Sequence, residues 1–361
     1  MRIAQVPPLA ERIPPKLYGG TERVVSWLTE ELVALGHEVS LFGTADAITK
    51  ATLVPVWPSA TRLSRPQTDP FAPMASLLEA VAAAAPRFDV IHCHLDWVHI
   101  PLLKRLQVPF LTTLHNRLDL PYLRNAARSF AKAPFVSISN NQREPLPGLN
   151  WLGTVHHGLP AAMLEFSRHS GGYLAFLGRI DPEKGPETAI RLAKASGLPL
   201  RIAAKVPSGK NQYFRDRIQP LVDGSQIQFI GEVGERDKSK FLRNALALLF
   251  PIDWPEPFGL VMIEAMACGT PIIAFKRGSV PEVIEDGVSG FVVENEAEAL
   301  SAIARLKELD RSRVRETFER RFTARRMAED YGRIYARLAQ IGAAVTAGDR
   351  VEGNSLSFHV A

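Results

Sequence analysis

Two glutamates in the second half of the chain have a spacing and a context that could serve chemistry. Glu256 and Glu264 are separated by seven residues within the run 255–294, which begins Pro-Glu-Pro-Phe-Gly-Leu. The apolar spacing after Glu256 predicts a helix over 259–268 and then a buried strand at 271–275. Glu264 would lie in an early turn of that helix and Glu256 at its mouth, where backbone N–H groups attract an anionic ligand. The alternative is that both carboxylates belong to a solvated helix face.

A second candidate feature is the turn Gly-Arg-Ile-Asp-Pro-Glu-Lys-Gly at residues 178–185. It follows a predicted strand and precedes a helix expected to begin near Pro186. Arg179 and Lys184 on this turn could neutralise a diphosphate, because a guanidinium forms a bidentate fork and an ammonium acts as a point charge. The alternative is that both are ordinary surface charges after a turn.

Paired glycines, Gly19 and Gly20, follow the first predicted strand within the loop 14–22. Before a helix, such a pair lets the backbone approach a phosphate closely. An ordinary glycine turn capped by Thr21 is the alternative. The sequence contains neither the Gly-x-Gly-x-x-Gly dinucleotide fingerprint nor a Walker A loop.

Histidines stand at the ends of two neighbouring predicted strands. His92, His94 and Asp96 alternate along one strand, so their side chains share a face. Such a set could bind a divalent metal, but a polar strand end facing a cleft is the favoured interpretation. His115, at the end of the next strand, could be an active-site residue or a structural hydrogen-bonding residue.

Composition indicates an ordinary globular protein of about two domains. The 361 residues are 46% hydrophobic and 22% charged, with a net charge of +5 that is spread along the chain. No basic block with interleaved aromatics points to nucleic acid, whereas weak attraction to an anionic membrane stays open. No apolar run is long enough for a membrane helix, and residues 1–10 do not resemble a signal peptide. With only two cysteines, the sequence predicts a cytoplasmic protein.

Strands alternate with helices in two successive halves, which predicts an α/β fold with two doubly wound parallel sheets. The expected domains are residues 1–160 and 172–321, joined by the segment 159–172, with a C-terminal helix over 322–342 completing the first domain. Residues 342–361 are expected to form a loosely ordered tail. The expected strands are 3–6, 39–42, 90–93, 110–114 and 135–138 in the first half, and 173–177, 200–204, 227–230, 246–250 and 271–275 in the second. The expected helices are 22–35, 75–85, 100–106, 187–195, 213–221, 238–244 and 259–268.

These features, in this order, resemble the retaining nucleotide-sugar glycosyltransferases of family 4 over about residues 1–340. The resemblance implies a GT-B architecture, in which two Rossmann-like domains face a central cleft. It implies that the C-terminal domain binds the donor and the N-terminal domain the acceptor, and that no metal or other cofactor is bound. The sequence contains no Asp-x-Asp, the motif with which the other large glycosyltransferase fold holds a metal.

The resemblance also implies roles for single residues. Glu256 would hydrogen-bond hydroxyls of the donor sugar, Glu264 the ribose of the nucleotide, and His115 the donor sugar from the opposite domain. The donor site would also include Phe258, Gly259 and Leu260 of the glutamate motif, beside Arg179, Lys184, Gly19 and Gly20. No carboxylate nucleophile is evident, which agrees with front-face attack assisted by the leaving phosphate.

Three other functions stay open. Similar scaffolds serve nucleotide-sugar epimerases and cofactor-bearing phosphorylases, and a non-catalytic nucleotide-sugar-binding protein is a further alternative. The family's frequencies favour UDP as the nucleotide, but nothing names the acceptor, which could be a carbohydrate, a lipid-linked group or a small molecule. Loops 57–74 and 116–128 are expected to shape its pocket. Trp97, Tyr122 and Trp151 could stack on a sugar or pack in the core.

Overall fold

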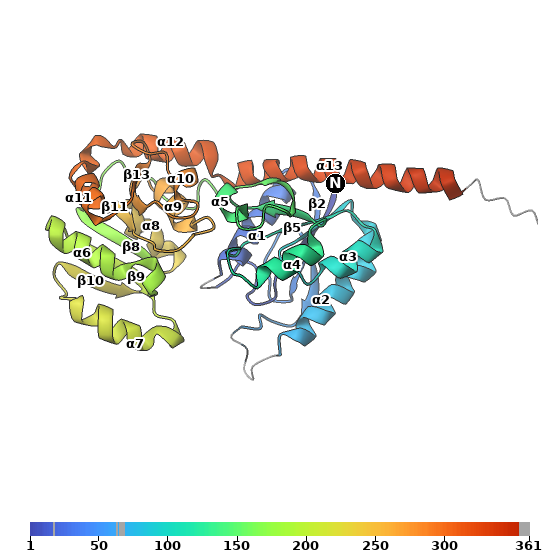
Figure 1. Ribbon diagram of the computed structural model, residues 1–361, viewed down its shortest axis with the longest axis horizontal. Coiled ribbons are helices and arrows are strands. Elements are labelled where there is room, and N and C mark those ends of the chain that lie inside the picture. Colours follow the sequence, from blue (N-terminus) through green and yellow to red (C-terminus); the bar gives the residue numbers. More distant parts are fainter. Residues whose placement is uncertain (17–18, 63, 65–68, 354–361) are drawn as a thin grey trace, which may run out of the picture.

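Two parallel sheets with helices on both faces make up the protein (Figure 1). The computed structural model describes residues 1–16, 19–62, 64 and 69–353. Both sheets have the doubly wound strand order. In each, strands are added on one side of the first strand and then on its other side. The predicted α/β fold class with two Rossmann-like sheets is therefore confirmed.

The first sheet has seven strands in the order β3-β2-β1-β4-β5-β6-β7. Its strands are β1 Arg2–Val6, β2 Glu38–Thr44, β3 Thr52–Trp57, β4 Val90–Cys93, β5 Phe110–Thr113, β6 Pro134–Ser137 and β7 Asn150–Thr154. Its helices are α1 Gly20–Ala34, α2 Phe71–Ala84, α3 Ile100–Leu106, α4 Leu123–Phe130 and α5 Asn140–Arg143.

The second sheet has six strands in the order β10-β9-β8-β11-β12-β13. Its strands are β8 Tyr173–Arg179, β9 Leu200–Lys205, β10 Ile227–Gly231, β11 Ala245–Phe250, β12 Ile272–Phe275 and β13 Gly290–Val293. Its helices are α6 Pro186–Ser196, α7 Asn211–Tyr213, α8 Glu235–Arg243, α9 Leu260–Ala267, α10 Val280–Val283, α11 Glu296–Ala304 and α12 Arg311–Arg321.

Several of the expected elements differ from those in the structure. Strands β3, β7 and β13, all at sheet edges, were not expected: β3 contains Pro55, β7 is half polar, and β13 has only four residues. The helix expected over 213–221 is irregular, with a π-helical turn at Phe214–Ile218 and a 3-10 turn at Gln219–Leu221, since Pro220 cannot continue an α-helix. The final helix, α13, is Ala324–Gly353, so it begins two residues later and extends well beyond residue 342. The run after 340 is rich in alanine and has no proline, which favours helix.

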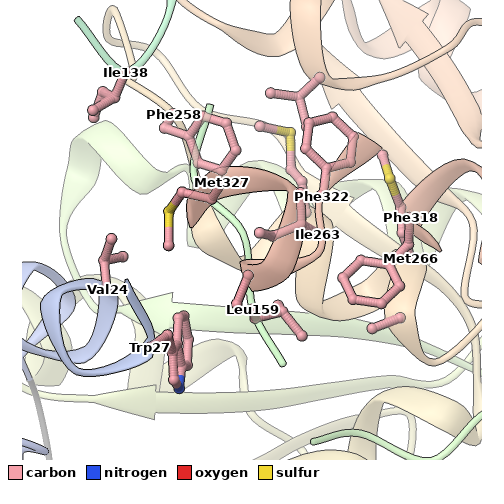
Figure 2. Close-up of a cluster of buried hydrophobic side chains, with 14 of the residues drawn as sticks. Val24, Trp27, Ile138, Leu159, Phe258, Ile263, Met266, Phe318, Phe322 and Met327 are labelled. Atoms are coloured by element: carbon pink, nitrogen blue, oxygen red, sulfur yellow. The ribbon is translucent and has the colours of Figure 1, made fainter. Parts of the chain in front are cut away.

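Helix α13 leaves the second sheet and packs along the first (Figure 1). At the crossing, the Leu159 N–H donates to the carbonyl of Phe322 (3.0 Å), and the Ala324 N–H donates to the carbonyl of Leu159 (2.9 Å). Figure 2 shows Phe258, Phe322, Met327 and Leu159 in one buried apolar cluster at this junction, with Val24 and Trp27 from α1. The segment around Leu159 and the start of α13 therefore lie side by side, held by these hydrogen bonds and by the buried cluster.

A carboxylate from the unit built on the second sheet also caps a short helix of the unit built on the first sheet. Glu282 on α10 accepts hydrogen bonds from the backbone N–H groups of Asn140 (2.7 Å) and Asn141 (2.6 Å) at the start of α5. This contact links α10 to α5. None of the helices in the described part of the chain is long and apolar enough to cross a bilayer.

Candidate functional site

A cleft of about 1280 Å³ is lined by loops that follow strands of both sheets. The carboxyl ends of parallel strands meet at one edge of a sheet, and the loops there are free to carry ligand-binding groups. All ten residues predicted for the site line this cleft: Gly19, Gly20, His115, Arg179, Lys184, Glu256, Phe258, Gly259, Leu260 and Glu264. The structure therefore brings together residues that lie up to 245 positions apart in the sequence.

Lys184 and Glu256 form an ion pair on one wall of the cleft. Lys184 Nζ lies 2.5 Å from Glu256 Oε2, and the two side chains are only 15% and 12% exposed. The ammonium also lies 4.2 Å from the centroid of the Trp254 ring, within the range of a cation–π contact. An anion bound in the cleft would share Lys184 with the Glu256 carboxylate.

The turn that carries Arg179 and Lys184 is held by local hydrogen bonds. Arg179 ends β8, and its guanidinium lies 3.6 Å from the Glu183 carboxylate. The Asp181 side chain accepts from the N–H of Glu183 and caps the 3-10 turn Pro182–Lys184. Gly185 then has a φ of +70°, and a Cβ there would lie 2.0 Å from the carbonyl oxygen of Pro251, so the turn packs against the glutamate loop without room for a side chain.

Gly278 packs beneath the loop that carries Glu256. Its φ is +56°, and a Cβ there would lie 2.4 Å from both the backbone N and O of Glu256. We expect Gly278→Ala to lower the free energy of unfolding by about 3 kcal/mol or more, because a strained φ is combined with a backbone clash. Urea unfolding monitored by circular dichroism measures this loss.

Gly287 supplies the matched control for that substitution. Its φ is +73°, but no described residue has an atom within 4 Å of its Cβ position. Gly287→Ala should cost only about 1 kcal/mol, since it adds strain without a clash. Equal losses in the two variants would mean that close packing under the Glu256 loop contributes nothing.

Glu264 lies in the second turn of α9, and its side chain is 6% exposed. Lys238 of α8 contacts it with Nζ 2.7 Å from Oε1. Arg23 of α1, from the first unit, also lines the cleft and interacts electrostatically with Glu264. Neither Lys238 nor Arg23 was predicted, because only the packing of α1 and α8 beside α9 brings them there. A basic residue in an early helical turn was the only available signal.

The residues between Glu256 and Glu264 have two kinds of position, at the wall of the cleft and in the apolar core. Gly259, with a φ of +79°, immediately precedes α9, and Leu260 lies at the cleft beside Gly20. The Phe258 ring is 2% exposed and packs between His157 and Phe322. Phe258 thus has a structural place at the junction in addition to the donor-site place expected for it.

The paired glycines stand at the start of α1. Gly19 precedes the helix, and a Cβ on it would lie 2.9 Å from Pro15 Cβ, so the loop is closely folded. Leu17 and Tyr18 of the predicted motif lie outside the described residues. Glu22 in the first turn is buried, and burial raises its pKa. The helix N-terminus itself offers backbone N–H groups to the cleft.

Four histidine rings lie in a row at the cleft, and three of them, His94, His115 and His157, line it. The ring centroids of His92 and His94 are 4.0 Å apart, those of His94 and His115 5.1 Å, and those of His115 and His157 5.3 Å. Burial lowers the pKa of all four, that of His115 to about 3. They are therefore neutral near pH 7.

The metal interpretation of His92, His94 and Asp96 finds no support. His92 is fully buried and hydrogen-bonds Tyr335 and Thr113 instead of facing the cleft, so the expected polar strand end is only partly correct. His94 and Asp96 do line the cleft. The described residues include no cluster of three or more His, Cys, Asp or Glu side chains suited to a metal ion.

Acid should destabilise the protein through these histidines and through His99, whose pKa burial lowers to about 3. In the unfolded chain each histidine binds a proton near pH 6.5, whereas in the fold it stays neutral. The free energy of unfolding should therefore fall as the pH decreases below about 6.5, by about 1.4 kcal/mol per pH unit for each histidine. Urea unfolding at pH 7.5, 6.5 and 5.5 measures the slope.

Single substitutions test this origin of the acid sensitivity. His99→Gln should reduce the slope by about one proton. His169→Gln, at an exposed position, should leave it unchanged. Stability that is constant from pH 7.5 to 5.5 would contradict the account.

Of the three aromatic residues considered for stacking on a sugar, two line the cleft and one packs in the core. Tyr122 is 68% exposed and lines the cleft. Trp97 also lines it, while stacking on Phe130. Trp151 packs against Phe135 outside the cleft and donates its indole N–H to the carbonyl of Leu146, so it belongs to the core.

Comparisons with known proteins agree with this geometry. The model of group 1 glycosyl transferases matches residues 166–321, and the model of glycosyltransferase family 4 matches residues 18–143. The chain belongs to glycosyltransferase family 4. The two matches correspond to the two sheets of this family 4 protein, and both include residues of the cleft.

One curated relative is the D-inositol 3-phosphate glycosyltransferase of Mycobacterium bovis (strain BCG / Pasteur 1173P2). It is 34% identical to the family 4 protein over 151 residues, which are 39% of this chain and 31% of the relative. The chain thus spans about a third of the length of the curated relatives it matches.

Solved structures show that the family 4 protein has the GT-B fold. The sucrose-phosphate synthase of Thermosynechococcus elongatus has a TM-score of 0.78 at 19% identity, covering 94% of this chain and 99% of that one. Anabaena HepE, in complex with UDP and glucose, has a TM-score of 0.69 at 18% identity, covering 93% and 100%.

Proposed function

We propose that this family 4 protein transfers a sugar from a nucleotide-sugar donor, with a UDP-sugar favoured, to a hydroxyl group of an acceptor, with retention of anomeric configuration. The observation that carries the proposal is the meeting of two lysine–glutamate pairs with His115 in one cleft between the sheets. Cations suit a diphosphate, and carboxylates suit the hydroxyls of a sugar and a ribose. HepE, which has been crystallised with UDP and with UDP-glucose, supports UDP as the nucleotide.

The two units would divide the substrates between them. The unit 172–321 carries Arg179, Lys184 and both glutamates, and we assign it the donor. The unit 1–160, with the helix after residue 322, would hold the acceptor against the wall that includes Trp97 and Tyr122. His115 would reach the donor sugar from this side.

The mechanism follows from where charge develops. Breaking the bond between the anomeric carbon and the diphosphate leaves an oxocarbenium-like sugar and an additional negative charge on the leaving group. Arg179 and Lys184 would stabilise that charge by preorganised electrostatics, together with N–H groups at the start of α1. Glu256, next to Lys184, would hold the sugar hydroxyls, and the leaving phosphate would take the proton of the acceptor hydroxyl.

Donor binding is expected to need no divalent metal, because side-chain cations would neutralise the diphosphate. Titration of the protein with UDP by calorimetry in excess EDTA should give the same affinity as titration with added Mg²⁺ or Mn²⁺. Turnover that disappears in EDTA and returns with Mn²⁺ would contradict the phosphate-neutralisation argument.

A panel of UDP-, GDP- and ADP-sugars in a thermal-shift assay tests the choice of donor. A nucleotide-sugar at 100 times its Kd should stabilise the fold by about 2.7 kcal/mol, which is enough for a clear rise in Tm. We expect a UDP-sugar to give the largest rise. A larger rise with a GDP- or ADP-sugar would reassign the nucleotide.

A further inference from the structure

A chain of buried hydrogen bonds connects helix α13 to His115 in the cleft. Gln5 Nε2 donates to the hydroxyl of Tyr335 over 3.2 Å, and His94 Nε2 lies 3.0 Å from Gln5 Oε1. His94 Nδ1 in turn lies 2.8 Å from His115 Nε2. Gln5, His94 and Tyr335 are all at most 4% exposed, so water does not compete for these bonds.

The direction of each bond follows from the chemistry of Gln5. An amide oxygen only accepts, so His94 must carry its proton on Nε2. Burial lowers the pKa of His94 well below its usual range, so the ring is neutral and has a single N–H. His94 Nδ1 is then an acceptor, and the short contact with His115 requires the proton of His115 to be on Nε2.

Tyr335 contacts the opposite side of the Gln5 amide. Its hydroxyl accepts from the Gln5 amide and lies 2.7 Å from His92 Nδ1. A reversed amide would reverse the chain and place a proton on His115 Nδ1. That nitrogen is buried and has no hydrogen-bond partner among the described residues. An orphaned N–H is rarer in proteins than an orphaned acceptor, which favours the observed direction.

We propose that Gln5 and His94 are positioning residues that hold His115 in its Nε2–H tautomer, so that Nδ1 accepts a hydrogen bond from a hydroxyl group of the sugar substrate. The role of Nδ1 in binding a sugar rests on the proposed function, whereas the tautomer of His115 does not depend on it. His115 lines the cleft and its Nε2 is bonded to His94, whereas its Nδ1 has no partner among the described residues, so Nδ1 is the nitrogen left for a ligand. A lone pair at this place selects a sugar that presents a hydroxyl over an analogue that lacks it.

The tautomer can be measured directly on the unmodified protein. A long-range ¹H–¹⁵N spectrum of ¹⁵N-histidine-labelled protein at pH 7.5 distinguishes a protonated ring nitrogen from a bare one, and the signals of His115 are assigned by their loss in His115→Gln. We expect His115 to have a protonated Nε2 and a bare Nδ1. A protonated Nδ1, or an averaged mixture, overturns the proposal even if the protein is an active glycosyltransferase.

Two substitutions of Gln5 test the coupling. Gln5→Met removes the acceptor for His94, and we expect mixed His115 tautomers and about a tenfold slower release of UDP from the UDP-sugar substrate, with the Kd for UDP changed less than twofold. Gln5→Glu keeps an acceptor at the same place and should restore the tautomer and most of the rate. An unchanged tautomer in Gln5→Met, or an equal loss of UDP affinity, shows a merely structural role. Wild-type protein that binds no nucleotide-sugar defeats the proposed function alone.

Discussion

Replacing Lys184 by methionine is expected to lower kcat/KM for the donor on the order of 10²- to 10³-fold. Methionine keeps the length of the side chain and its packing on Trp254, so the change is mainly one of charge. It removes a cation from the diphosphate and leaves Glu256, whose side chain is 12% exposed, as a buried carboxylate without its partner. Losing one member of such a pair costs more than losing a surface ion pair, because the remaining charge stays desolvated.

Lys210 provides the matched control for Lys184. It lies 3.6 Å from Asp181, is 41% exposed, and does not line the cleft. Lys210→Met should change kcat/KM less than twofold, as expected for a solvent-screened pair. Steady-state kinetics of both variants measure this difference in kcat/KM. If Lys184→Met has the kinetics of Lys210→Met, Lys184 is not part of the donor site.

The two glutamates are expected to fail in different ways. Glu264, assigned to the ribose, would contact a part of the donor that does not react, so Glu264→Gln should raise KM about tenfold or more with a smaller change in kcat. Glu256, assigned to the sugar, would hold the group whose charge changes. Glu256→Gln should lower kcat about 10²-fold while nucleotide affinity is nearly preserved, because Lys184 stays available to the phosphate.

Binding of free UDP separates the two roles without any turnover. Calorimetry should show weaker UDP binding in Glu264→Gln and near-normal binding in Glu256→Gln. Each glutamate is paired with one lysine, so the two variants disturb comparable environments and serve as controls for one another. Loss of UDP binding in Glu256→Gln with normal binding in Glu264→Gln would reverse the assignment.

The sequence predicted best where local pattern and topology agree. The central strands are continuous apolar runs, as expected for strands covered on both faces, and parallel strands place their following loops at one edge. For this reason Arg179, Lys184, Glu256 and Glu264 could be expected to meet, and all of them line the cleft. Edge strands such as β7 are half polar and were missed.

What the sequence could not provide is contact between distant elements. Lys238 and Arg23 reach Glu264 only because α8 and α1 pack beside α9. His157 stacks on His115 from the crossing segment for the same reason. The length of α13 was underestimated, because a glycine-containing run past residue 340 reads as a tail when its packing is unknown.

The central claim is most directly tested by following a panel of nucleotide-sugars by ¹H NMR in the presence of the protein. The account predicts that a UDP-sugar is consumed, that UDP is released, and that the sugar first appears with the anomeric configuration it had in the donor. Slow transfer to water is sufficient for this readout, so the acceptor need not be known. Interconversion of one UDP-sugar into another without release of UDP would identify an epimerase, and binding without any reaction would identify a non-catalytic protein. Either result would contradict the assignment of transferase chemistry to this cleft.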